Sequence, residues 1–126
     1  MLTAARVHAT LPTADVDALR PFYEEVLGFA PRAVLASGVV YEAGGGSLFA
    51  ISRSGGAAAG THTQLAFTVP DVEEAVRDLR GRGVVFEEYE TPRTIDGVAR
   101  MPVGRAAWFR DPSGNLLGLV EFDAPF

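Results

Sequence analysis

The chain has 126 residues, of which 48% are hydrophobic and 21% are charged, and its formal net charge is −5. This length fits one domain with one core, and the absence of cysteine excludes disulfides, thiolate zinc sites and a cysteine nucleophile. All 11 basic side chains are arginines scattered among carboxylates, which argues against a nucleic-acid partner. No apolar run approaches the roughly 20 residues that span a bilayer, so we expect a cytoplasmic protein with no membrane partner.

The first part of the chain predicts a strand, a helix and three more strands. The first strand is expected over 6–11 and ends before Pro12. Asp15 is expected to cap a helix whose apolar residues recur at three-and-four spacing and which ends at Gly28. Pro21 in its second turn predicts a kink or a later start. Glycine-containing turns then separate three segments that we expect to form antiparallel strands, 32–36, 39–43 and 47–52.

The same order of elements begins again after a glycine-rich linker over 54–61. A strand is expected over 64–69, followed by a helix that Asp71 caps and Gly83 ends. Three further strands are expected over 84–89, 106–110 and 116–122. The longer loop over 90–104 contains Arg93 and Arg100, with Arg105 just beyond it. The sequence leaves open whether these arginines cover a cleft or lie in solvent.

The two halves of the chain form an internal repeat. Sliding one half over the other places Gln64 on His8, Asp71 on Asp15 and Val72 on Val16. The predicted fold class is therefore α+β, with two tandem βαβββ modules over 1–53 and 62–126 in a single domain. We expect the modules to form a curved mixed sheet with a central cleft, where a ligand would bind.

Three segments carry a resemblance to a known family. HATLPTADVDALRPFYEEVLGF, TQLAFTVPDVEEAVRDLRGRGVVFEE and AAWFRDPSGNLLGLVEF resemble the vicinal oxygen chelate superfamily, which includes glyoxalase I, extradiol dioxygenases and the fosfomycin and bleomycin resistance proteins. The phrase FYEEVLGF and the RDPSGN turn are the most specific of these motifs, and the resemblance extends over 6–122. It implies a βαβββ fold and a homodimer. The many alanines and glycines, with arginine in place of lysine, are typical of a GC-rich genome and predict a bacterial source.

The resemblance also implies where a metal would bind. Metal-using members hold their ion at four corners, which correspond here to His8, Ala50, Gln64 and Gly118. The second and fourth corners carry glutamate in glyoxalase-like members. A catalytic divalent metal normally needs about three protein ligands, and this set offers one imidazole and one neutral amide. We therefore expect no metal cofactor. A weaker alternative is a divalent metal on His8, His62 and Gln64, whose last two side chains would share a face.

The most favoured function is binding of a small organic molecule in an apolar cleft without a metal. Trp108 offers a broad face for an aromatic or cationic ligand. The resemblance places the four corners and Trp108 at the cleft, and strand alternation from the corners adds Thr10, Leu48 and Ala66. The predicted ligand-binding set is therefore His8, Thr10, Leu48, Ala50, Gln64, Ala66, Trp108 and Gly118. The alternative is an enzyme of the lyase, isomerase or dioxygenase type, with an irregular metal site or with His8 as acid–base catalyst. Whether any reaction is catalysed stays open, as does whether the cleft lies within one chain or across a dimer.

Overall fold

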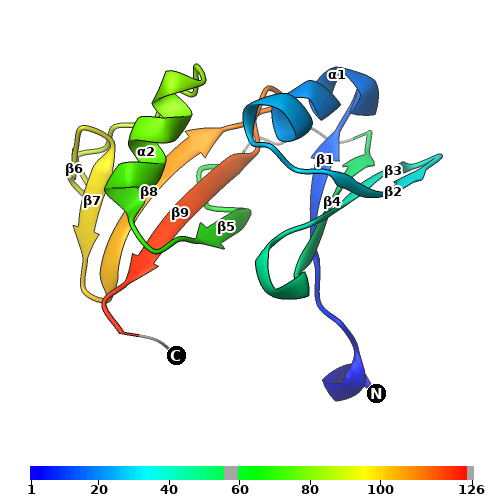
Figure 1. Cartoon of the computed structure of the whole chain (residues 1–126), viewed down its shortest axis with the longest axis horizontal. Helices are drawn as coiled ribbons and strands as arrows, with labels where there is room; N and C mark the ends of the chain where they lie inside the picture. The colour runs from blue at the N-terminus through cyan, green and yellow to red at the C-terminus, as the bar shows by residue number, and fades with distance from the viewer. Residues whose placement is uncertain (56–59, 125–126) are drawn as a thin grey trace. The chain divides into compact units, whose positions relative to one another are not determined.

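The computed structural model describes residues 1–55 and 60–124 and divides the chain into two compact units, Met1–Ala58 and Ala59–Phe126. Each unit contains one mixed sheet and one main helix, and Figure 1 shows both. The mixed α+β fold with its two sheets confirms the predicted fold class. Part of the predicted linker over 54–61 lies outside the described residues. No helix in the described ranges is long and apolar enough to cross a membrane.

The sheet of the first unit has four strands in the order β1-β4-β3-β2. Strand β1 pairs with β4 in parallel, and the other pairs are antiparallel. The bounds are Ala9–Thr13 for β1, Pro31–Leu35 for β2, Gly38–Glu42 for β3 and Leu48–Arg53 for β4. The prediction that the first strand ends before Pro12 was wrong, because β1 begins later and continues through this residue. An edge strand tolerates proline, since an N–H on the open edge needs no partner in the sheet.

The helix of the first unit changes geometry at Pro21, as its sequence predicts. Helix α1 covers Val16–Pro21, and its cap Asp15 accepts a hydrogen bond from Ala18 N at 3.1 Å. A π-helical turn over Phe22–Val26 follows, in which Leu27 N donates to Phe22 O at 2.9 Å. The chain then leaves the helix at Gly28, where φ is 86° and glycine is favoured.

Aromatic side chains fill the core between this helix and its sheet. The rings of Tyr23, Tyr41 and Phe49 are almost fully buried, and their centroids lie 5.3–5.7 Å apart. The hydroxyl of Tyr41 donates to a Glu24 carboxylate oxygen at 2.9 Å, and Arg20 Nε donates to the same oxygen at 2.6 Å. Burial, together with the neighbouring Glu24 carboxylate, raises the pKa of Tyr41 well above its usual value. The phenol therefore stays protonated and tethers the end of the helix to β3.

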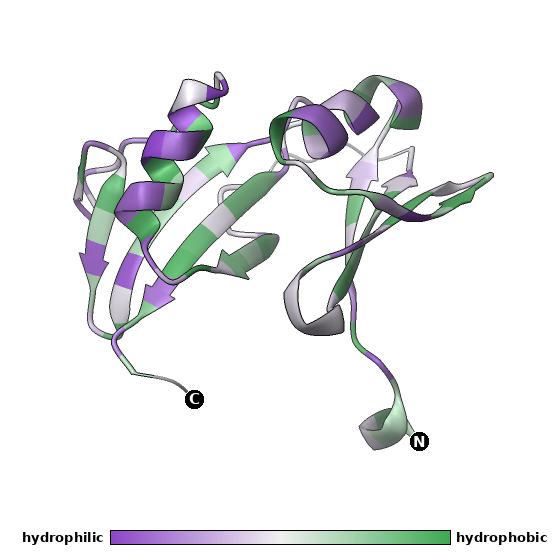
Figure 2. Ribbon diagram, in the orientation of Figure 1, coloured by the Kyte–Doolittle hydropathy of each residue, from purple (hydrophilic) through white to green (hydrophobic). Residues whose placement is uncertain are grey.

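The sheet of the second unit has five strands in the order β5-β9-β8-β7-β6. Strand β5 pairs with β9 in parallel, and the other pairs are antiparallel. The bounds are Leu65–Thr68 for β5, Thr94–Ile95 for β6, Val98–Met101 for β7, Gly104–Arg110 for β8 and Leu116–Phe122 for β9. Helix α2, Val72–Gly81, contacts β8 and β9. Hydrophobic residues lie along β9, whereas α2 alternates between hydrophobic and hydrophilic residues (Figure 2).

The predictions for 84–89 and 90–104 were wrong. Segment 84–89 is not a strand: it forms one isolated bridge, from Phe86 to Phe109, because β7 occupies the first part of the same edge of β8. The strand that pairs with β8 in place of 84–89 is β7, which lies inside the segment 90–104 that was predicted as a loop. The sequence signal for this strand is the pair Asp96-Gly97, which forms the tight turn between β6 and β7. The two residues have φ values of 52° and 82°. An Asp-Gly pair is a strong hairpin signal.

Candidate functional site

Each sheet has a helix-free face, which is the face opposite its helix. In the first unit, Phe49 and Ile51 of β4 are buried, so the alternate residues of this strand lie on the helix-free face. The predicted residues Leu48 and Ala50 are among them and are half-buried. Thr10 is the register partner of Ala50 and shares this face. The structure therefore brings together Thr10, Leu48 and Ala50, whereas His8, which was predicted to lie in the first strand, precedes β1 and is exposed.

The predicted residues of the second unit also lie together. Ala66 and Trp108 are the register partners of Gly118 on its two sides. A Cβ atom added to Gly118 would lie 3.6 Å from Ala66 Cβ and from Trp108 Cδ1, and 3.2 Å from Thr63 Cγ2. The half-buried Trp108 also donates from its indole Nε1 to Thr63 Oγ1 at 3.0 Å, and its ring lies 5.6 Å from that of Tyr89. This face is thus apolar, with one fixed aromatic side chain.

Gln64 lies at the start of this face, but both ends of its side-chain amide are engaged. Its Nε2 donates to Asn115 Oδ1 at 3.0 Å, and its Oε1 accepts from Leu116 N at 3.0 Å. Its backbone N–H also donates to Leu116 O at 2.9 Å. Gln64 therefore joins the segment before β5 to the start of β9, and its oxygen already has a donor.

Asn115 and Asp111 form a buried turn that the sequence analysis did not assign to the site. One oxygen of Asp111 accepts from the backbone N–H groups of Ser113 and Asn115, and the other accepts from Asn115 Nδ2 at 2.8 Å. Asp111 is 4% exposed and Asn115 is fully buried. The turn therefore fixes the side chain to which Gln64 is bonded. The RDPSGN motif was the available signal, since a short polar run between two strands needs internal hydrogen bonds.

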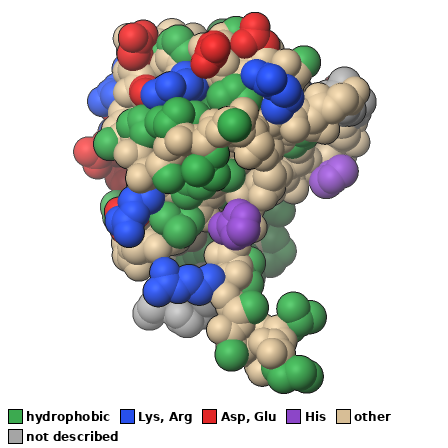
Figure 3. All heavy atoms as spheres, turned by 90° about the vertical axis from the view of Figure 1, so that its right-hand side faces the viewer, with side chains coloured by type: hydrophobic (Ala, Val, Ile, Leu, Met, Phe, Trp, Pro, Cys, Tyr) green, Lys and Arg blue, Asp and Glu red, His purple; other side chains and the backbone are tan. Residues whose placement is uncertain are grey.

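The residues at the four corners do not fit a divalent metal. Ala50 and Gly118 carry no donor atom, and the Gln64 oxygen is occupied by a backbone N–H. His8 and His62 are both exposed, and histidine side chains lie open at the surface in Figure 3. Across residues 1–55 and 60–124, no three histidine or carboxylate side chains are grouped so as to hold a metal ion. A hard cation is held largely by anionic oxygen ligands, and these corners supply none.

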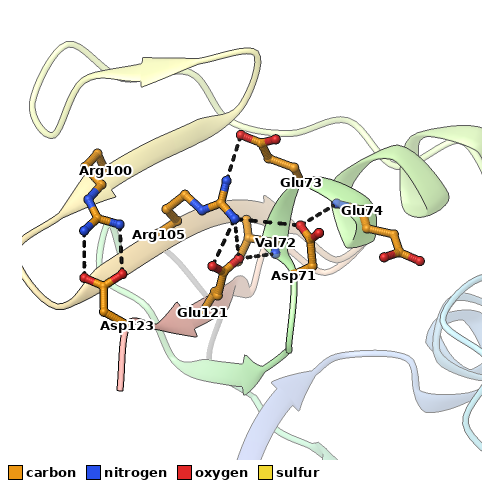
Figure 4. A network of polar contacts seen from close by, with 8 residues as sticks. All are labelled: Asp71, Val72, Glu73, Glu74, Arg100, Arg105, Glu121 and Asp123. Atoms are coloured by element: carbon orange, nitrogen blue, oxygen red, sulfur yellow. Dashed lines mark hydrogen bonds and ion pairs between the residues drawn. The ribbon is translucent and has the colours of Figure 1, made fainter. Parts of the chain in front are cut away.

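Glu121 is the carboxylate nearest in sequence to the Gly118 corner, and it lies on the opposite face of β9. Its Oε1 accepts from Val72 N at 2.9 Å and from Arg105 Nη2 at 2.8 Å (Figure 4). Arg105 also pairs with Glu73 of α2 at 2.9 Å. Glu121 therefore binds the first turn of α2 and is not a substitute for a metal ligand. These two donors, the Val72 N–H first and Arg105 second, lower the pKa of Glu121.

We expect the Glu121 contacts to be lost in acid. A carboxylate whose pKa is lower in the folded state stabilises the fold above its unfolded pKa of about 4.3, and loses this effect as the pH falls through its folded pKa. Carboxyl carbon chemical shifts in an NMR titration should therefore give Glu121 a midpoint below the usual glutamate value. Glu121→Gln should weaken the dependence of stability on pH in the acid range. A normal midpoint, or an unchanged pH profile in the variant, would contradict this assignment.

Comparison with known proteins places these features in a family. The family model described as Glyoxalase/Bleomycin resistance protein/Dioxygenase superfamily matches residues 5–119. No curated protein sequence matches the chain. A solved member of this superfamily from Sphaerobacter thermophilus is 28% identical, with a TM-score of 0.72 over 96% of this chain and 99% of that one.

Two other solved structures share the fold. TnmS3, an antibiotic-binding protein from Streptomyces sp. CB03234, is 23% identical, with a TM-score of 0.71 over 95% of this chain and 98% of that one. Lactoylglutathione lyase from Agrobacterium tumefaciens is 21% identical, with a TM-score of 0.67 over 94% of this chain and 93% of that one. The same fold therefore occurs in a binding protein and in an enzyme. From the family match, this chain belongs to the Glyoxalase/Bleomycin resistance protein/Dioxygenase superfamily.

Proposed function

We propose that this protein binds a small organic molecule on the helix-free face of a sheet, with Trp108 of the second unit as the main contact, and without a metal ion. One observation carries the proposal: of the four corner positions of the family's metal site, two hold small side chains without donor atoms and one holds an engaged amide, which leaves His8 as the single strong donor beside an apolar surface. Ala50 and Gly118 carry no side-chain donor atom, and the side chains of Thr63, Ala66 and Trp108 crowd the position where a Cβ atom on Gly118 would lie. An apolar surface suits an organic ligand, whereas a metal needs donor atoms.

Trp108 is the residue that we expect to contact the ligand most extensively. Its Cδ1 would lie 3.6 Å from a Cβ atom added to Gly118, and its hydrogen bond to Thr63 fixes its orientation. A fixed indole binds aromatic rings and cations at a low entropic cost. The net charge of −5 favours a cationic ligand. The resemblance to the antibiotic-binding protein TnmS3 supports a ligand of antibiotic type.

The proposal is tested by calorimetry and by Trp108 fluorescence, using metal-free bleomycin and a panel of aromatic cations that includes ethidium. Since Trp108 is the only tryptophan, quenching reports on this face alone. We expect quenching by at least one compound, and loss of the binding heat in Ala66→Arg, which places a charge beside Trp108. The matched control is Val103→Arg at a residue that is 59% exposed, which should bind as the unmodified protein does.

Two results would overturn the proposal. One is the absence of quenching and binding heat across the panel. The other is a stoichiometric, tightly held divalent metal in protein purified without chelators, which would favour the enzyme alternative. We also propose that the protein is a homodimer, as the family resemblance implies, and that it is cytoplasmic, as the sequence pattern predicts. Sedimentation velocity should then give the mass of two 13.4 kDa chains, and a monomer at all concentrations would contradict it.

A further inference from the structure

The second unit contains a groove on the side of its sheet that carries α2, away from the Trp108 face. The groove has a volume of about 770 Å³, within the range of small-molecule sites. Helix α2 and the hairpin formed by β6 and β7 supply most of its walls. Its lining residues are Glu73, Val76, Arg77, Arg80, Arg93, Ile95, Asp96, Val98, Arg100 and Arg105.

Positive charge is concentrated in this groove although the chain as a whole is acidic. Five arginines line it, against two carboxylates. Arg105 and Arg100 are neutralised, since Arg105 pairs with Glu121 and Glu73, and Arg100 binds both oxygens of Asp123 at 3.0 and 2.7 Å (Figure 4). The other three arginines, Arg77, Arg80 and Arg93, form no ion pair with any residue that the structure describes.

These three arginines reach the groove from two sides. Arg77 and Arg80 are three residues apart on α2 and so lie on the same side of the helix. The Arg80 guanidinium stacks over the Phe86 ring, 5.7 Å from its centroid, and this contact limits its freedom. Arg93 comes from the segment just before β6. Arginine forks from opposite walls can bind one phosphate or carboxylate group through charge-assisted hydrogen bonds.

The rest of the groove wall is apolar, apart from Glu73, which pairs with Arg105, and Asp96 in the hairpin turn. Val76 is 2% exposed, and Val98 is half-buried. Ile95 lies on the hairpin and is 67% exposed, so a large aliphatic side chain is in contact with water. A ligand that covered Ile95 would remove this apolar area from water. The groove therefore combines uncommitted positive charge with an apolar wall.

We infer that this groove is a second binding site, which takes a small organic anion with an apolar body and a phosphate or carboxylate group. Arg77 and Arg93 bind the anionic group, Arg80 is positioned by Phe86 to assist them, and Ile95 and Val98 contact the apolar body. This site is separate from the one proposed on the Trp108 face. It also differs from that site in charge, because it selects anions.

The test uses four probes in ¹H–¹⁵N NMR titrations of the full chain: phenyl phosphate, benzoate, inorganic phosphate and benzyl alcohol. We expect phenyl phosphate, benzoate or both to shift the amides of Ile95 and Val98 and the side-chain Nε–H signals of Arg77 and Arg93. Phosphate and carboxylate sources are distinguished by which of the two aromatic anions binds more tightly. Inorganic phosphate and benzyl alcohol should bind more weakly than the better aromatic anion. Inorganic phosphate lacks the apolar body, and benzyl alcohol lacks the anionic group.

Exposed arginines provide variants that should not disturb folding. Arg77→Gln and Arg93→Gln should each weaken binding at least about fivefold, as loss of a charge-assisted hydrogen bond does. The control is Arg82→Gln, also on the α2 side of the unit but outside the groove lining, which should bind as the unmodified protein does. The inference is overturned if neither aromatic anion shifts these signals, if Arg82→Gln weakens binding equally, or if inorganic phosphate binds as tightly as phenyl phosphate.

Discussion

Replacing Phe49 with alanine should lower the free energy of unfolding by about 4 kcal/mol, as expected for a buried phenylalanine in a packed core. Phe49 is 2% exposed, and its ring centroid lies 5.0 Å from that of Phe29, 5.3 Å from Tyr41 and 5.7 Å from Tyr23. Alanine would leave a cavity among rings that are held by β3 and the helix, so the neighbours cannot collapse into it. Urea denaturation followed by circular dichroism measures the loss.

Two controls separate a cavity effect from a general loss of hydrophobicity. Phe49→Leu keeps most of the side-chain volume and should cost clearly less than the alanine variant. Val34→Ala, at a residue that is 59% exposed, should change the stability by less than about 0.5 kcal/mol. Equal losses in Phe49→Ala and Val34→Ala would show that the aromatic cluster does not support the first unit.

Replacing Asp111 with alanine should cost about 3 kcal/mol, because it leaves several buried donors without an acceptor. The carboxylate accepts hydrogen bonds from two backbone N–H groups and from Asn115 Nδ2. Asn115 is fully buried, so water cannot replace the missing oxygens while the turn stays folded. Because Asn115 Oδ1 accepts from Gln64 Nε2, the change should also disturb the Gln64 side chain.

Thermal unfolding measures the first effect, and the side-chain amide signals of Gln64 in NMR spectra report the second. Asp78→Ala is the matched control: it removes an exposed carboxylate that forms a helix ion pair with Arg82 at 3.4 Å. Exposed pairs of this kind contribute less than about 0.5 kcal/mol. An Asp111 variant as stable as the Asp78 variant, or with unchanged Gln64 signals, would show that the turn does not position Gln64.

The candidate site was predictable to the extent that strand alternation defines it. Side-chain direction in a strand has a fixed period of two. For this reason one face of the first sheet carries Thr10 and Ala50, and one face of the second carries Ala66, Trp108 and Gly118. By the same rule Glu121 lies on the opposite face of β9 from Gly118, where it accepts a hydrogen bond from Val72 N. Hydrogen-bond partners follow no such period.

The engagement of Gln64 illustrates that difference. Its partner Asn115 is 51 positions away in the chain, and only the parallel pairing of β5 with β9 brings the two side chains together. The groove beside α2 could not be predicted from the sequence for a similar reason. Arg77 and Arg80 belong to the helix and Arg93 to a segment that was predicted as a loop, so their proximity depends on where the β6–β7 hairpin folds back.

By itself, the sequence determined the repeated βαβββ order, the two aspartate caps, the effect of Pro21 and the family, because these depend on local periodicity, capping chemistry and short motifs. Only the tertiary structure decided which segment pairs with the edge of β8 that does not pair with β9. Segment 84–89 was predicted to be that strand, but β7, which follows the Asp96-Gly97 turn, pairs with the first part of the edge, and 84–89 forms one bridge. The tertiary structure also brings arginines that are scattered along the sequence together in one charged groove. Charges that are distant in the sequence become neighbours only after the chain has folded.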